Sequence, residues 1–160
     1  MKFSIIHIES LSGKNAQVYS LHYEGKYAPE LQIFVDKFGD SHPNVIQSTI
    51  RRIYTISNRD GIQESFFKRE SPESHNVFRL LETEWLRIYC IIFGNIILLF
   101  GAGDKKRLNT KKNIENPQIE KIVSELMKVE DCIKNKIHDG ELILTMDGFL
   151  GNLIDITFEG

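Results

Sequence analysis

The sequence is poor in cysteine and in long apolar runs, and each of these two shortages excludes a class of protein. Of its 160 residues, two are cysteine and four are proline. Two cysteines cannot build the disulfide framework of a small secreted domain, so Cys90 and Cys132 are expected to be reduced, buried thiols. Met1–Ser10 alternates apolar and polar residues and lacks the continuous apolar core of a secretory signal. We therefore expect a cytoplasmic protein.

The most apolar stretch, residues 85–100, is too short and too interrupted to cross a membrane. It spans about sixteen residues, carries Arg87 and is broken by Gly94, whereas a membrane helix needs about twenty uninterrupted apolar residues. The formal net charge of −2 argues against binding nucleic acid through bulk charge. This net charge is still compatible with a local basic patch that binds nucleic acid.

The sequence also lacks the common motifs of cofactor and metal enzymes. Residues 101–103 are too short for a dinucleotide or Walker phosphate loop. No serine stands in a Gly-x-Ser-x-Gly turn, and the five histidines share no ligand-like spacing with each other or with the cysteines. We therefore expect neither a cofactor nor a metal.

Residues 77–103 predict the centre of an antiparallel sheet. Three runs rich in β-branched and aromatic residues follow one another there. Gly94-Asn95 lies between the second and third runs and is typical of a tight hairpin turn. Alternation gives the second run two faces, one with Arg87, Tyr89, Ile91 and Phe93 and the other with Leu86, Ile88, Cys90 and Ile92.

Helix and strand patterns account for most of the remaining chain. Helices are predicted at 29–38, 43–56 and 117–139, the last with an apolar stripe at every third or fourth residue. Short strands are predicted at 3–10, 16–23, 141–145 and 154–158, and 58–76 is expected to be a loop over the sheet. The pattern predicts one α+β domain over 1–160, with two N-terminal helices on one side of an antiparallel sheet and the third helix packed across it.

Cations and a phenol gather in this predicted arrangement. Arg87 and Tyr89 project together from the central strand, and Arg79 joins them if the register of the preceding strand brings it to the same face. Residues 104–112 hold five lysines or arginines against the single acid Asp104. Such groups on one sheet face are suited to holding a phosphodiester and stabilising its transition-state charge. The alternative is structural, an amphipathic cover for apolar neighbours beside a solvated loop.

The ordered set of these features resembles the RelE/ParE toxin superfamily, most closely its HigB-like branch of phage-derived and Bacteroidetes-type proteins. The resemblance covers roughly residues 28–140 and includes the order of an N-terminal strand followed by two helices. It is carried by Arg87-x-Tyr89-Cys90, the hairpin turn, a β-run ending in Gly101-x-Gly103, the basic loop, and Glu115-Asn116-Pro117 before an amphipathic helix.

The resemblance implies a RelE-like toxin of a type II toxin–antitoxin system. Such a toxin is a metal-independent endoribonuclease, or mRNA interferase, that usually cleaves ribosome-bound mRNA. Its implied partners are mRNA, the ribosome and a cognate antitoxin, for which a helix-turn-helix protein is a candidate. By position, the Arg-x-Tyr match falls on Arg87 and Tyr89, and Arg79 is added as a second phosphate contact. The basic-loop match, implied to bind RNA, falls on Lys105, Lys106, Arg107 and Lys111.

The sequence departs from the family pattern at several positions. Ile92 stands where relatives often carry a basic residue, and Lys111 where they often carry arginine. Arginine and lysine are not interchangeable at a bidentate phosphate site. Phe100 and Ala102 stand where relatives tend to have glycine. A rival hypothesis follows, a non-catalytic interaction module that retains the toxin scaffold and binds a protein partner.

Overall fold

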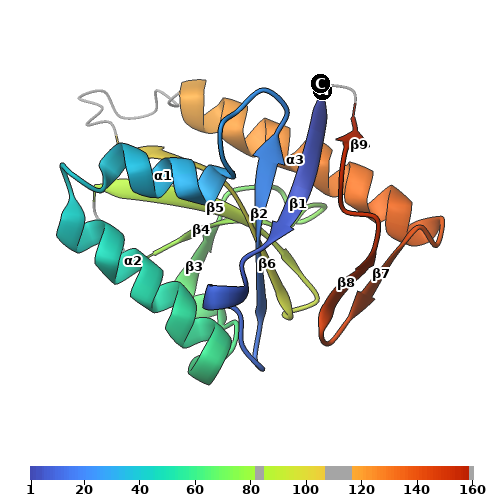
Figure 1. Ribbon diagram of the computed structural model, residues 1–160, viewed down its shortest axis with the longest axis horizontal. Coiled ribbons are helices and arrows are strands. Elements are labelled where there is room, and N and C mark those ends of the chain that lie inside the picture. The colour runs from blue at the N-terminus through green and yellow to red at the C-terminus, as the bar shows by residue number, and fades with distance from the viewer. Residues whose placement is uncertain (82–84, 107–116, 159–160) are drawn as a thin grey trace.

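A mixed sheet forms the centre of the computed structural model, which describes residues 1–81, 85–106 and 117–158. Within these ranges the sheet has seven strands in the order β3-β4-β5-β6-β2-β1-β9 (Figure 1). The strands are β1 (Lys2–His7), β2 (Gln17–Tyr23), β3 (Phe67–Arg69), β4 (Val77–Leu80), β5 (Leu86–Phe93), β6 (Ile97–Lys105) and β9 (Ile156–Thr157). A separate two-stranded hairpin pairs β7 (Leu142–Thr145) with β8 (Gly148–Gly151).

Three α-helices in the described ranges cover the two faces of the sheet. α1 (Glu30–Phe38) and α2 (Pro43–Thr55) lie on one side, and α3 (Pro117–His138) crosses the other (Figure 1). A π-helical turn, η2 (Ile56–Asp60), prolongs α2, and short 3-10 turns, η1 (Glu9–Leu11) and η3 (Glu64–Phe66), precede β2 and β3. The α+β class and the placement of the helices on opposite faces are confirmed.

β5 divides the interior into two apolar cores, as its alternation predicts. Tyr89, Ile91 and Phe93 belong to the core beneath α3. Leu86, Ile88 and Cys90 belong to the core beneath α1 and α2, which Ile92 also contacts. The side-chain period of two therefore assigns each residue of this strand to the predicted face.

The turn at Gly94-Asn95 is confirmed. Gly94 has φ 57° and Asn95 φ 55°, so both central residues adopt the left-handed conformation that a type I′ turn requires. The Ile96 N–H donates to the Phe93 carbonyl at 3.0 Å and closes the turn. β5 and β6 consequently pair as an antiparallel hairpin from Phe93↔Ile97 back to Leu86↔Lys105, with one irregularity between Ile88 and Cys90.

The amphipathic stripe of α3 faces the sheet. Leu126, Val129 and Ile133 are buried, and Ile119, Ile122 and Ile137 pack partly buried at the margin of the same core. The helix ends at His138, two residues before Gly140, whose φ of 79° only a residue without Cβ adopts readily. The predicted helix over 117–139 is confirmed to within one residue.

The prediction of a wholly antiparallel sheet is wrong at one pair. β2 runs parallel to β6, from Gln17↔Ile97 to Ser20↔Phe100. Two strands can be parallel neighbours when the chain between them crosses from one end of the sheet to the other. Here that connection contains α1 and α2, which cover one face on the way, so the sheet is mixed.

Two predictions about short strands are also wrong. The segment 58–76, expected to be a loop, contains β3, which pairs with β4 at Phe67↔Leu80. At the C-terminal end, the predicted strands at 141–145 and 154–158 correspond to β7 and β9, but the sequence pattern misses β8, which lies between them and pairs with β7, while β9 joins the main sheet beside β1. Gly148 belongs to β8, has φ 117°, and leaves no room for a Cβ, which would lie 2.2 Å from the Tyr19 hydroxyl. Close packing and backbone conformation therefore both require glycine at this position.

Two further observations bear on the sequence predictions. Both cysteines are free thiols, Cys90 buried and Cys132 half-buried. Across residues 1–81, 85–106 and 117–158, none of the helices is both long enough and apolar enough to span a bilayer.

Candidate functional site

Arg79, Arg87 and Tyr89 lie together on the α3 face of the sheet. Arg79 on β4 is directly opposite Tyr89 on β5, and residues in that relation share a face with their Cβ atoms about 4.5–5.5 Å apart. Arg87 precedes Tyr89 by two residues on the same strand and therefore projects to the same side. The predicted co-location of the three side chains is confirmed, and the condition on the register of Arg79 is met.

Two charged residues that the sequence interpretation left out complete this row. Lys68 on β3 is directly opposite Arg79 and is exposed at the sheet edge. Glu70 lies just beyond β3, and its Oε1 is 2.7 Å from Arg79 Nε, with only 14% of the Arg79 and 18% of the Glu70 side chain exposed. Neither residue could be placed while 58–76 was interpreted as a loop.

By the geometry of the described residues, Arg87 Nε and Tyr89 Oη are buried without a well-formed hydrogen bond, although the Arg87 side chain is close enough to act on the pKa of the Tyr89 phenol. Leaving a buried donor unsatisfied costs about 1–3 kcal/mol, and native proteins tolerate few such groups. Both atoms belong to side chains on the same face. Two donors placed in this way are suited to an anionic oxygen.

Tyr89 is less accessible than a half-exposed sheet face would make it. Its side chain is fully buried in the core to which α3 contributes Leu126. Burial raises the pKa of the Tyr89 phenol, and the Arg87 and Arg79 guanidinium groups oppose this shift only in part. The phenol is therefore protonated at neutral pH and acts as a donor. The amphipathic helix α3 covers this part of the sheet face.

The basic stretch after β6 begins at the same end of the sheet as Arg87. Asp104 is directly opposite Arg87, and Lys105 is opposite Leu86. Lys105 and Lys106 are exposed, whereas Asp104 lies 3.5 Å from Lys37 on α1. The predicted RNA-binding residues Arg107 and Lys111 lie outside the described residues.

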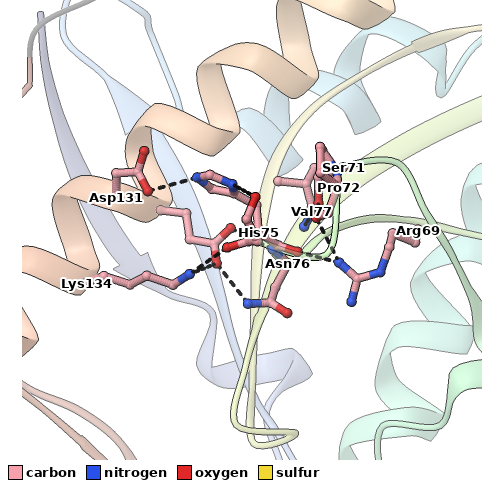
Figure 2. A network of polar contacts seen from close by, with 10 residues as sticks. Arg69, Ser71, Pro72, His75, Asn76, Val77, Asp131 and Lys134 are labelled. Atoms are coloured by element: carbon pink, nitrogen blue, oxygen red, sulfur yellow. Dashed lines mark hydrogen bonds and ion pairs between the residues drawn. The ribbon is translucent and has the colours of Figure 1, made fainter.

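A buried carboxylate fastens α3 to the loop between β3 and β4 (Figure 2). Glu130 is fully buried and accepts hydrogen bonds from the Asn76 backbone N–H at 2.8 Å and from Asn76 Nδ2 at 2.9 Å. Lys134 Nζ lies 2.9 Å from Glu130, and His75 contacts Asp131 one residue along the helix at 2.8 Å. Through these contacts α3 is held to the residue that precedes β4, near the Gly94-Asn95 turn. Nothing in the sequence around Glu130 and Asp131, which lie in a helix rich in charged residues, indicates that they hold α3 to this loop.

A cleft of about 760 Å³ opens at the other end of β4 and β5, near the Gly94-Asn95 turn. Its lining combines aromatic and aliphatic side chains with Arg69 and Lys134. Arg69 lies over the Phe78 ring at 4.7 Å and donates to the Pro72 and His75 carbonyls. None of Arg79, Arg87 and Tyr89 lines this cleft. The concave surface and the cationic cluster are therefore separate features.

Among the described residues, no group of three or more His, Cys, Asp or Glu side chains is arranged to hold a metal ion. Comparison of the chain with protein-family models, curated proteins and solved structures finds no match.

Proposed function

We propose that this chain is a toxin-like, metal-independent endoribonuclease that cleaves mRNA, as its resemblance to the HigB-like branch of the RelE/ParE superfamily implies. One observation carries the proposal: Arg79, Arg87 and Tyr89 share one face, and two of their buried donor atoms lack a well-formed hydrogen bond within the described residues. The order of β2, α1, α2, the β4–β6 strands and α3 is the order in which the resembling features occur.

The cluster has the groups that cleavage of a phosphodiester by the neighbouring 2′-hydroxyl requires. In that reaction the 2′-oxygen bonds to phosphorus, its proton passes to water, and the bond to the 5′-oxygen breaks. Arg87 and Arg79 would contact the phosphate and offset its growing negative charge. The protonated Tyr89 phenol would donate to the departing 5′-oxygen. Lys105 and Lys106, exposed at the same end of the sheet, would hold the RNA backbone.

The second candidate is a non-catalytic interaction module that binds a protein partner. Two observations favour it: Tyr89 is fully buried, and the Glu70 carboxylate already neutralises Arg79 at 2.7 Å. In this case the arginines and the phenol would serve to support the sheet rather than to contact RNA. In that case neither a cognate antitoxin nor the ribosome would be needed for the activity of this chain.

Expression toxicity and cleavage of ribosome-bound mRNA distinguish the two candidates. We expect Arg87→Ala to abolish both and to leave the circular dichroism spectrum unchanged. Tyr89→Phe should lower the cleavage rate by roughly 10²- to 10⁴-fold if the phenol transfers a proton. The matched control is Arg51→Ala, which removes an exposed arginine from α2, on the other side of the sheet. A wild-type chain that is neither toxic nor active with ribosomes supplied would eliminate the endoribonuclease and leave the interaction module.

A further inference from the structure

The β7–β8 hairpin carries an exposed apolar face. Ile143 and Leu150 are directly opposite each other on the two strands, and they are 55% and 58% exposed. Met146 at the turn between the strands is 81% exposed. The alternate residues Leu142 and Phe149 point the other way and are buried. One face of the hairpin thus completes the core, and an equally apolar face is presented to solvent.

This hairpin is fixed in place, so its outer face is preformed. The Phe149 N–H donates to the Tyr19 hydroxyl at 3.1 Å. The Phe149 ring packs against Tyr19 and Phe93 with ring centres 5.3 and 5.5 Å away. Within the described residues the hairpin pairs with no other strand, and Figure 1 shows it below the C-terminal end of α3. A rigid apolar surface of this kind is typical of an interaction site.

Two acidic residues lie at the ends of the apolar face. From Ile137 to the last residue the sequence has no lysine or arginine, and it has five acids: Asp139, Glu141, Asp147, Asp155 and Glu159. Glu141 precedes β7 at the base of the outer face, and Asp147 lies in the turn at its tip. Lys136 on α3 pairs with Glu141 at 2.9 Å, whereas Asp147 forms no ion pair within the described residues. Acids therefore lie at both ends of the exposed Ile143–Leu150 pair.

We propose that the outer face of β7–β8 binds a basic, amphipathic segment of a partner protein. The apolar side chains of that segment would cover Ile143, Leu150 and Met146, and its lysines or arginines would lie toward Asp147 and Glu141. Charge decides among the possible occupants, because RNA, an anionic membrane and a second copy of this hairpin would each bring negative charge to an acidic surface. The inference is independent of the proposed endoribonuclease, whose residues lie on β4 and β5 and at the end of β6.

The test uses the full chain and a fluorescent helical peptide with leucines on one face and lysines on the other. We expect saturable binding that weakens with salt. The Ile143→Thr/Leu150→Thr double variant should weaken it by about tenfold or more, the usual loss at the centre of an interface. Asp147→Asn should weaken it less. Leu81→Thr, which changes a leucine that is 47% exposed beyond β4, is the matched control and should bind as the wild type does.

Several results would overturn the proposal. A peptide with glutamates in place of the lysines should not bind, and equal affinity for it would refute the role of charge. Equal affinity of the double variant would remove the hairpin from the site, provided that its thermal unfolding matches that of the wild type. Binding of a single-stranded RNA or of anionic vesicles instead of the lysine peptide, or dimerisation that the double variant abolishes, would assign the surface to another occupant.

Discussion

Glu130 gives the sharpest test of how α3 is held on the sheet. Its carboxylate is fully buried, and it satisfies both the backbone N–H and the side-chain amide of Asn76 while it pairs with Lys134. Truncation in Glu130→Ala leaves the half-buried Asn76 donors without an acceptor and Lys134 without its partner. Lys134 is 43% exposed and can be hydrated without its partner, so the main cost is that of the unsatisfied Asn76 donors, about 1–3 kcal/mol. That is a measurable part of the 5–15 kcal/mol that stabilises a typical domain.

Urea unfolding followed by circular dichroism measures this loss, and an unchanged denaturant slope shows that the native and unfolded states keep their compactness. Asp131→Ala is the matched control, since Asp131 is the next residue and its contact with His75 is made by a side chain that is 59% exposed. A surface pair of this kind is worth less than about 1 kcal/mol. A Glu130→Ala loss no larger than that of the control would refute the reasoning, because it would mean that water satisfies the Asn76 donors.

Three further predictions concern the core, the phenols and the basic stretch. Leu126→Ala should cost about 2–5 kcal/mol in urea unfolding, since it opens a cavity beneath α3, and a loss below about 1 kcal/mol would make the helix a detachable arm. Burial raises the pKa of both Tyr89 and Tyr23 above the ordinary value of 10.0, so their contribution to stability is complete below pH 10 and is lost as the pH rises further. Tyr89→Phe should therefore reduce the fall of the unfolding free energy in alkaline titration, and an unchanged fall would contradict the burial. Replacing Lys105 and Lys106 by alanine should lower the log–log salt slope of RNA binding by somewhat under one for each phosphate that the variant no longer neutralises, and an unchanged slope would make both lysines ordinary surface residues.

The sequence predicts the central strands well because their chemistry is local. Alternation along β5 is enough to place Arg87 and Tyr89 on one face, and Gly94-Asn95 is enough to define the turn that follows. The position of Arg79 opposite Tyr89 depends on the register of β4, which no local pattern specifies. The sequence therefore could not predict whether Arg79 lies on the same face as Arg87 and Tyr89.

The remaining errors have tertiary causes. β3 is three residues long, which is too short to show an alternation of apolar and polar residues. The sequence pattern therefore predicts a loop there and does not identify Lys68 and Glu70 as neighbours of Arg79. The burial of Tyr89 depends on α3, which follows it by almost thirty residues and packs over its face. Gly148 is required because the Tyr19 hydroxyl, which is far away in the sequence, leaves no room for a Cβ. Neighbours of this kind can be identified only once the strands are assembled.

The parallel pairing of β2 with β6 has a consequence for how the chain folds. Gln17 and Ile97 are direct neighbours in the sheet although they are 80 positions apart in the sequence. The β1–β2 hairpin can form early from local contacts, but its apolar edge stays without a partner until β6 has been synthesised and the helices between them have docked. Closing so long a loop costs conformational entropy before the contacts between β2 and β6 can form. This cost slows folding and prolongs the exposure of that edge to other chains. During synthesis, the free edge of β2 is therefore exposed until β6 is available.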